Sequence, residues 1–215
     1  MFKALNKLVG GGDFNEIQLQ PSAEPICATE PRFCLPNSVT LRLREKFFSL
    51  SGDDFKISCA TTGTPYFQCQ GKLFSLREKK VIRDNAGVPV ANFKEQLISF
   101  TDKFNVYAGD SSDKNICKCS ASFTFVRAKL TSVFEDVMTG KSRRLILKGD
   151  WRDKRCVIYW GEPKQGGVPI AKIFRPLSVR SHLLETDGYL LEIAPGVDIA
   201  LMVIMCIALD EHARD

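Results

Sequence analysis

Basic side chains gather in one short stretch of the 215-residue chain, where they could bind phosphate. The segment 141–155 reads KSRRLILKGDWRDKR and holds seven Lys or Arg and two Asp, so it accounts for the net charge of +5 of the whole chain. Positive charge this dense suits phosphate groups on lipids or nucleic acids. The alternative interpretation is an ordinary solvated edge strand that carries charge to avoid aggregation.

Strand alternation places Arg143 and Leu145 on one face of this segment, and Arg144 and Lys148 on the other. A strand facing a packed core should not carry charge in mid-run, so we expect the arginine pair at a strand end or in a loop. A hairpin with the following strand would gather the charges, and bidentate arginine bonds would suit a phosphorylated inositol head group. The predicted lipid-binding residues are Lys141, Arg143, Arg144, Arg152, Lys154 and Arg155.

Histidine and paired carboxylates give little basis for catalysis. The two histidines are His182 and His212, and no Gly-x-Ser-x-Gly surrounds any serine. We expect His182 to be structural, and His212 to end a helix, where a cation suits the dipole. Asp53 and Asp54 are adjacent, so on a strand they would point to opposite faces. The sequence therefore predicts no catalytic residue and no enzyme.

One polar loop has the oxygen-bearing side chains that calcium prefers. Asp110, Asp113 and Asn115 lie in GDSSDKN, but Lys114 takes a place that an EF-hand gives to an oxygen ligand. We favour a polar hairpin loop and leave calcium binding there open. No cofactor is expected, because the sequence contains no Walker motif and Gly10–Gly12 follow no strand.

Eight cysteines raise the question of disulfides or metal. The first residues, MFKALNKLVGGGDF, contain no apolar region of signal-peptide length, so we expect a cytoplasmic protein with reduced, mostly buried thiols. Cys117 and Cys119 would share one face of a strand, but no second cysteine pair or nearby histidine completes a zinc site.

Short β-rich runs separated by turn residues fill most of the chain. Residues 10–38 are rich in Gly, Pro and polar residues, so we expect an irregular or flexible lead-in over 1–24 and a single domain over 25–215. From residue 39 on, the runs include VTLRLRE, DFKISCA, PYFQCQG, FNVYAG, RRLILKG, RCVIYW and VPIAKIF. Short strands at close spacing predict an antiparallel sandwich or barrel.

Two stretches of the chain resemble each other. AGVPVANF at 86–93 and GGVPIAKI at 166–173 share Gly-Val-Pro, a β-branched residue and Ala in register. Each follows a strand and a turn, and Gly87 can supply the positive φ that the first turn needs. The match weakly indicates two related halves of a sheet.

The run from Ile199 to Leu209 contains eleven consecutive apolar residues. A membrane-spanning helix needs about 20, whereas about 10–14 is typical of a buried core helix. Asp198 stands at a plausible N-cap and charged residues follow the run, so we expect a helix to about His212. The β-branched residues Val203, Ile204 and Ile207 would suit a strand, but eleven apolar residues without alternation favour a helix.

A helix that is apolar on every side needs protein all round it. In a chain otherwise made of strands, a closed β-barrel wrapped around the helix supplies that environment and leaves no sheet edge exposed. The predicted fold class is therefore mainly β, a closed antiparallel barrel of about twelve strands around a central hydrophobic C-terminal helix. We expect no transmembrane segment.

Several motifs recur in this order in one known family. They are Phe33-Cys34, the hairpin at 81–90, the Gly-Asp-Ser-Ser-Asp turn at 109–113, Gly149-x-Trp151, and Val-Asp before the terminal helix with Leu-Asp-Glu after it. In these features, over about residues 25–215, the chain resembles the LURP-one-related family of the tubby C-terminal-like superfamily, which is related to the phospholipid scramblases. The resemblance implies a twelve-stranded barrel around a central helix.

The resemblance also implies a class of function. Tubby-type domains bind phosphoinositides through basic residues, and LURP-one-related proteins are associated with defence responses in plants. We therefore expect a non-enzymatic module in defence or stress signalling that binds phosphoinositides or acidic phospholipids and is cytoplasmic or peripheral at membranes. Two alternatives remain open: scramblase-like lipid transport, and a module that binds protein or, less expected, nucleic acid.

Overall fold

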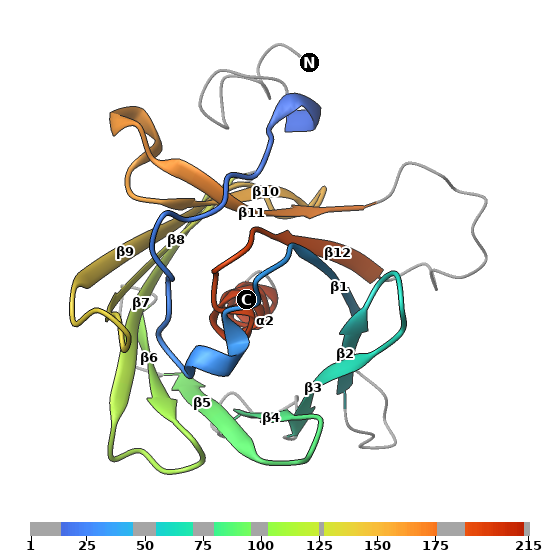
Figure 1. Ribbon diagram of the computed structural model, residues 1–215. Coiled ribbons are helices and arrows are strands. Elements are labelled where there is room, and N and C mark those ends of the chain that lie inside the picture. The colour runs from blue at the N-terminus through green and yellow to red at the C-terminus, as the bar shows by residue number, and fades with distance from the viewer. Residues whose placement is uncertain are drawn as a thin grey trace.

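A computed structural model describes residues 14–44, 55–70, 80–95, 103–124, 127–175 and 188–212 of the chain. Within these ranges almost every regular element is a strand, as the sequence predicts (Figure 1). The strands are β1 Val39–Arg44, β2 Phe55–Cys59, β3 Pro65–Gln70, β4 Lys80–Asp84, β5 Pro89–Glu95, β6 Lys103–Ala108, β7 Asn115–Thr124, β8 Arg127–Glu135, β9 Ser142–Asp150, β10 Arg155–Trp160, β11 Val168–Phe174 and β12 Gly188–Ile193. The helix α2 spans Ile199–His212, and short 3-10 turns lie at η1 Phe14–Glu16, η2 Pro31–Phe33 and η3 Pro163–Gln165.

The twelve strands form one closed antiparallel barrel. Each strand pairs with its neighbours in sequence, and β1 closes the ring by pairing with β12 over its whole length, from Val39 opposite Ile193 to Arg44 opposite Gly188. Closure leaves no strand edge unpaired, and local connections between neighbours keep the topology simple. The predicted barrel of about twelve strands is confirmed.

The C-terminal helix occupies the centre of this barrel (Figure 1). Every residue from Ile199 to Asp210 is buried, and most have no exposed surface. The inward side chains of the strands form one continuous apolar core with the helix. A helix surrounded by sheet on all sides must be apolar on all sides, which explains why the run shows no polar face. No helix within the described ranges combines the length and apolar character that a bilayer crossing needs.

Asp198 fixes the beginning of the helix. One carboxylate oxygen accepts hydrogen bonds from the backbone N–H groups of Ala200 and Leu201 at 3.0 and 3.1 Å, which is the predicted N-cap. The other accepts bonds from Ala28 N, Thr29 N and Thr29 Oγ1 at 3.0, 2.7 and 2.8 Å. One buried carboxylate therefore ties the helix to the segment that closes this end of the barrel.

That closing segment runs through residues 26–35. Ile26 pairs with Val197 as an isolated parallel bridge, and Cys34 pairs with Asp198. Ile26 has no exposed surface, and Phe33 packs against Phe67 with the two rings tilted and their centroids 5.2 Å apart. The segment thus covers the barrel end at which the helix begins, and it excludes water from the helix N-terminus.

The other end of the helix is held by a buried ion pair. Lys154 Nζ lies 2.8 Å from a carboxylate oxygen of Asp210, and Tyr189 donates its hydroxyl to the second oxygen at 2.7 Å. The ammonium group also lies 3.8 Å from the ring centroid of Trp151, so its charge is shared with an aromatic face. Breaking such a pair leaves an uncompensated buried charge, which costs about 3–5 kcal/mol.

The two similar sequence stretches form equivalent hairpins. In β4–β5, Ile82 faces Ala91 and a bulge follows Ile82; in β10–β11, Ile158 faces Ala171 and a bulge follows Ile158. Both turns use a glycine at positive φ, Gly87 at 80° and Gly166 at 85°. The hairpins lie six strands apart in a ring of twelve, so the weak sequence match corresponds to the same register in opposite halves of the barrel.

Candidate functional site

The β9–β10 hairpin separates the six predicted lipid-binding residues into two groups. In its register Arg155 faces Asp150, and Trp160 faces Leu145. Residues 141, 143 and 144 therefore lie at one end of the barrel wall, and residues 152, 154 and 155 at the other. At about 3.3 Å per residue the two groups are roughly 25 Å apart. The expectation that the hairpin gathers these charges is wrong, because a hairpin brings together the end of one strand and the start of the next.

Lys141 and Arg143 are held by carboxylates of the same chain. Glu24 accepts hydrogen bonds from Lys141 Nζ at 2.7 Å and from an Arg143 nitrogen at 2.6 Å, and these two contacts hold the pKa of Glu24 below its ordinary value. Arg143 points inward at the strand end, 3.6 Å from buried Asp136 and over the ring of Trp160 at 4.9 Å. A lipid phosphate would have to compete with Glu24 for both cations.

The second group divides into structural and exposed residues. Lys154 is 3% exposed and belongs to the ion pair that holds the helix, so it is unsuited to a ligand in solution. Arg155 is half-buried, with its guanidinium over the ring of Phe14 at 5.0 Å. Arg152 is exposed, and its backbone carbonyl accepts a bond from Arg175 at 3.3 Å.

Arg144 belongs to a larger basic surface that segment 141–155 alone does not show. It points to the outside of β9, where the neighbouring strands also present cations. We call this surface the basic face: the outer side of β6, β7, β8 and β9, which carries Lys103, Lys118, Arg127, Lys129, Arg144 and Lys148. The acidic residues at the described outward positions of these four strands are Glu135 and, at the end of β9 opposite Arg155, the mostly buried Asp150. All six cations are exposed except Lys148, which is half-buried.

Strand pairing sets the geometry of the basic face. Lys129 lies directly opposite Lys148, and Lys118 and Arg144 flank Val133 in one row across three strands. Adjacent strands are about 4.8 Å apart, so Lys118 and Arg144 are roughly 10 Å apart, and the two rows are roughly 13 Å apart along the strands. Like charges placed opposite each other are unfavourable unless a counter-ion or ligand neutralises them.

An ion pair with Glu162 compensates part of this repulsion. Lys148 donates to Glu162 from the β10–β11 loop, and this bond, helped by the charges of Lys148, Lys129 and Lys164, holds the pKa of Glu162 below its ordinary value. For the side chains of Lys118, Lys129 and Arg144 the described part of the chain provides no comparable carboxylate partner. These three remain available to an external anion.

Sequence reasoning found Arg144 but missed most of the basic face. The signal was present in KFNVYA, NICKCS and RAKLTSVFE, where each Lys or Arg occupies a polar position that alternates with apolar or cysteine residues. A dense basic run is conspicuous in the sequence, whereas single cations on separate strands gather only when the sheet register is known. Such a surface is found by comparing residues that lie side by side on neighbouring strands, not by reading one strand at a time.

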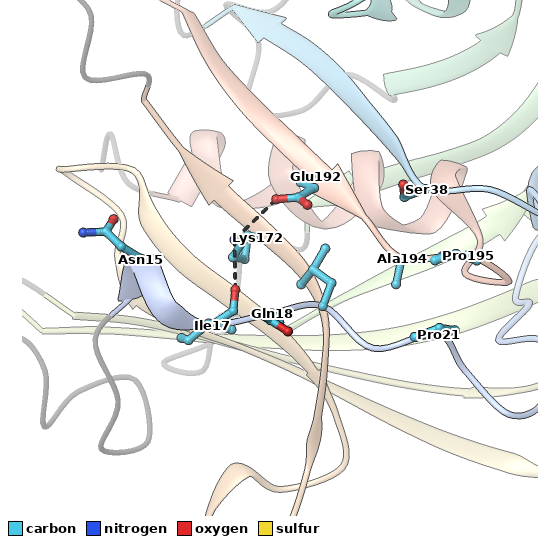
Figure 2. A pocket seen from close by; sticks show the side chains of 10 residues that line it. Asn15, Ile17, Gln18, Pro21, Ser38, Lys172, Glu192, Ala194 and Pro195 are labelled. Atoms are coloured by element: carbon cyan, nitrogen blue, oxygen red, sulfur yellow. Dashed lines mark hydrogen bonds and ion pairs between the residues drawn. The ribbon is translucent and has the colours of Figure 1, made fainter.

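The N-terminal segment, residues 14–21, lies against the outside of the barrel at β10 and β11, next to the strands of the basic face (Figure 1). Phe14 packs with Val157 and Tyr159 on the outer side of β10, and Lys172 Nζ donates to the backbone carbonyl of Ile17 at 3.0 Å. Between this segment and β11–β12 lies a pocket of about 390 Å³, shown in Figure 2. Lys172 and Glu192 meet at its floor at 3.4 Å, so the cation there is already neutralised.

Reactive side chains form no catalytic group in the part of the chain that the structure describes. All eight cysteines are free thiols and six are buried; Cys117 and Cys119 lie with their sulfurs 3.7 Å apart inside the barrel. Burial raises the pKa of Cys156, which makes its thiol a poor nucleophile. Within the described ranges no three His, Cys, Asp or Glu side chains converge on a metal position. Asp53, Asp54 and His182 lie outside these ranges.

Comparisons with known proteins agree with the fold. The family model described as LURP-one-related matches residues 39–210. Protein LURP-one-related 15 of Arabidopsis thaliana is 26% identical over 86% of this chain and 85% of its own length, and LURP-one-related 10 is 25% identical over 86% and 95%. The X-ray structure of an Arabidopsis thaliana protein matches with a TM-score of 0.60 at 22% identity, covering 86% of this chain and 97% of that one.

The family match spans most of the chain, from the first barrel strand into the last turn of the central helix. It therefore includes both the basic face and the carboxylate that fixes the helix. With its closed twelve-stranded barrel and its buried terminal helix, this chain belongs to the LURP-one-related family.

Proposed function

We propose that this protein is a non-catalytic barrel that binds anionic phospholipid membranes reversibly through its basic face. The observation that carries the proposal is the set of cations on four neighbouring strands. Among the described residues, the side chains of Lys118, Lys129 and Arg144 form no direct ion pair with a carboxylate. The protein acts at the cytoplasmic surface of membranes in this proposal, as a peripheral module in defence or stress signalling.

The fold supports a peripheral mode of binding over an inserted one. The single long apolar segment of the chain lies inside the barrel, where each of its side chains already has protein contacts. Scramblase-like transport through that segment would require the helix to leave the core and the barrel to open. Binding by an outer face requires no rearrangement, because the face is formed by the rigid wall itself.

The expected affinity is modest and dependent on salt. Each Lys or Arg close to an anionic leaflet contributes about 1 kcal/mol, and the attraction falls off over a Debye length of about 10 Å at 0.1 M salt. Phosphoinositides should bind more tightly than singly charged lipids, because several phosphate groups on one head group can meet both Lys118 and Arg144.

Removing three cations from the basic face should weaken membrane binding strongly. Changing Lys118, Lys129 and Arg144 together to Ala removes about 3 kcal/mol of attraction, or about 100-fold in affinity, if all three face the leaflet, and about 2 kcal/mol, or about 30-fold, if only Lys118 and Arg144 do. Co-sedimentation with vesicles that contain phosphatidylserine or a phosphoinositide measures this. The matched control changes Arg83, Arg152 and Arg175 to Ala, which removes the same charge outside the basic face.

The outcomes separate the site from the function. Strong loss in the first variant and near wild-type binding in the control support the basic face. Equal loss in both variants would show that only net charge matters, and absence of binding by the wild-type protein would remove the function. A DNA probe run in parallel tests the nucleic-acid alternative, since binding to DNA but not to vesicles would favour it.

A further inference from the structure

Exposed apolar side chains are concentrated at one end of the barrel. Among the described residues, the exposed large hydrophobic side chains are Val88, Val137 and Met138, at 51, 44 and 48% exposure. Val137 and Met138 are neighbours on the β8–β9 turn (residues 136–141), and Val88 lies on the β4–β5 turn at the same end. Single exposed apolar residues are common on protein surfaces, but two adjacent ones on a turn beside a basic face are typical of an interaction site.

The β8–β9 turn is built rigidly around buried Asp136. Its carboxylate accepts hydrogen bonds from Met138 N and Thr139 N, both at 3.0 Å, and from Cys27 N at 3.0 Å. Val137 N donates to the Cys27 carbonyl at 2.9 Å, so the turn is also attached to the segment that closes the barrel. The two apolar side chains are therefore presented in a fixed position, and little conformational entropy is lost when they contact a partner.

The turn follows directly on β8, the middle strand of the row that carries Lys118 and Arg144. Arg144 and Lys118 lie in the row that includes Val133, two residues before the end of β8 and four before Val137, which places this row at most about 13 Å from the tip of the turn. Apolar groups of interfacial proteins enter a bilayer to a depth of about 5–10 Å, beneath the phosphate layer. With Val137 and Met138 at that depth, Arg144 and Lys118 reach the level of the phosphates.

We propose that the β8–β9 turn is the insertion edge of this protein: Val137 and Met138 enter the acyl boundary of an anionic membrane while Arg144 and Lys118 bind its phosphates. The occupant is a phospholipid surface, because the apolar tips of the turn are followed, beyond Glu135, by the row with Arg144 and Lys118, which complements anionic head groups over an apolar layer. The inference rests on the proposed function and adds orientation to it: the β8–β9 side of this end of the barrel is tilted toward the bilayer, and the β4–β5 turn with Val88 is tilted away from it.

This orientation distinguishes two rows of cations that are otherwise alike. The row with Lys129 and Lys148 lies roughly 26 Å from the tip of the turn, well beyond a Debye length of about 10 Å. Lys118 and Arg144 lie within reach of the phosphates. Changing Arg144 to Ala should therefore reduce binding several-fold more than changing Lys129 to Ala, whereas a basic face lying flat on the membrane would make the two equivalent.

The direct test replaces the apolar tip. The double variant Val137→Ser with Met138→Ser keeps the backbone hydrogen bonds of the turn, and we expect it to bind vesicles of phosphatidylcholine and phosphatidylserine about tenfold more weakly than wild type. Val88→Ser is the matched control, because it removes an equally exposed valine from a turn four strands away; we expect binding within about twofold of wild type.

A second readout follows insertion itself and does not depend on loss of binding. Met138→Trp should show a blue shift of its fluorescence, and quenching by brominated lipid, with these vesicles; Val88→Trp should show neither. Wild-type binding that is unaffected by the double Ser variant, together with an unshifted Met138→Trp, would overturn the insertion edge alone. Absence of wild-type binding to the vesicles would overturn the insertion edge together with the proposed function.

Discussion

Replacing Ile204 with Asp is expected to unfold the protein. Ile204 lies in the middle of α2 with no exposed surface, and the barrel surrounds it with apolar side chains. A carboxylate placed there enters the apolar core, and its burial costs several kcal/mol on top of the cavity left by the lost side chain. Because small domains are stable by about 5–15 kcal/mol, this single change takes most of that stability. Loss of the near-ultraviolet circular dichroism signal and of solubility would report it.

The control at the same position keeps the apolar character. Ile204→Val removes one methylene and should cost about 1 kcal/mol, visible as a small shift in the urea midpoint with unchanged spectra. An Ile204→Asp protein that is soluble and fully folded would contradict the buried position of the helix. Release from membranes without unfolding would have the same consequence, because it would mean that the side chain faces lipid.

Asp198→Ala is expected to have the second largest effect on stability. The carboxylate accepts five hydrogen bonds, two from the helix N-terminus and three from residues 28 and 29 of the closing segment. Losing an N-cap costs about 1–2 kcal/mol, and each buried donor left without a partner costs about 1–3 kcal/mol. We expect a loss of about 5 kcal/mol in the free energy of unfolding, measured by urea denaturation.

Asp198→Asn separates the two roles of this carboxylate. Asparagine is as good an N-cap as aspartate, so the bonds to Ala200 and Leu201 can persist through its carbonyl oxygen. Its amide nitrogen then faces the donors of Ala28 and Thr29 and cannot accept from them. We expect a loss of about 2–3 kcal/mol for Asn. If Ala cost no more than an ordinary surface substitution, the tie between helix and closing segment would be absent.

The fold could be predicted from the sequence because the pattern that indicates it does not depend on how the strands are paired. Eleven apolar residues, preceded by the N-cap Asp198 and followed by charged residues, indicated a helix enclosed by protein. The short strands separated by turn residues indicated the sheet that encloses it. Gly87 also marked the turn of the first hairpin, since glycine adopts its φ of 80° without strain. Neither inference needed to know which strands are paired.

The candidate site could be predicted only in part, because charge placement depends on pairing and on partners distant in sequence. Lys154 reads as one more surface lysine, yet it lies buried against Asp210, which is 56 positions away. Glu24, which holds Lys141 and Arg143, is more than one hundred positions distant from both. No local sequence pattern predicts ion-pair partners that are so distant in the chain. Of the six cations predicted to bind lipid, only Arg144 lies on the basic face.

The central claim is that the barrel meets an anionic membrane with its outer surface while its apolar helix stays inside. Hydrogen–deuterium exchange of the protein with and without phosphatidylserine vesicles tests it directly. We expect the amides of 199–212 to remain protected in both states, and those of the β8–β9 turn and of the adjoining ends of β8 and β9 to gain protection on binding. Loss of protection in the helix on addition of vesicles, with no gain at the turn, would contradict the claim.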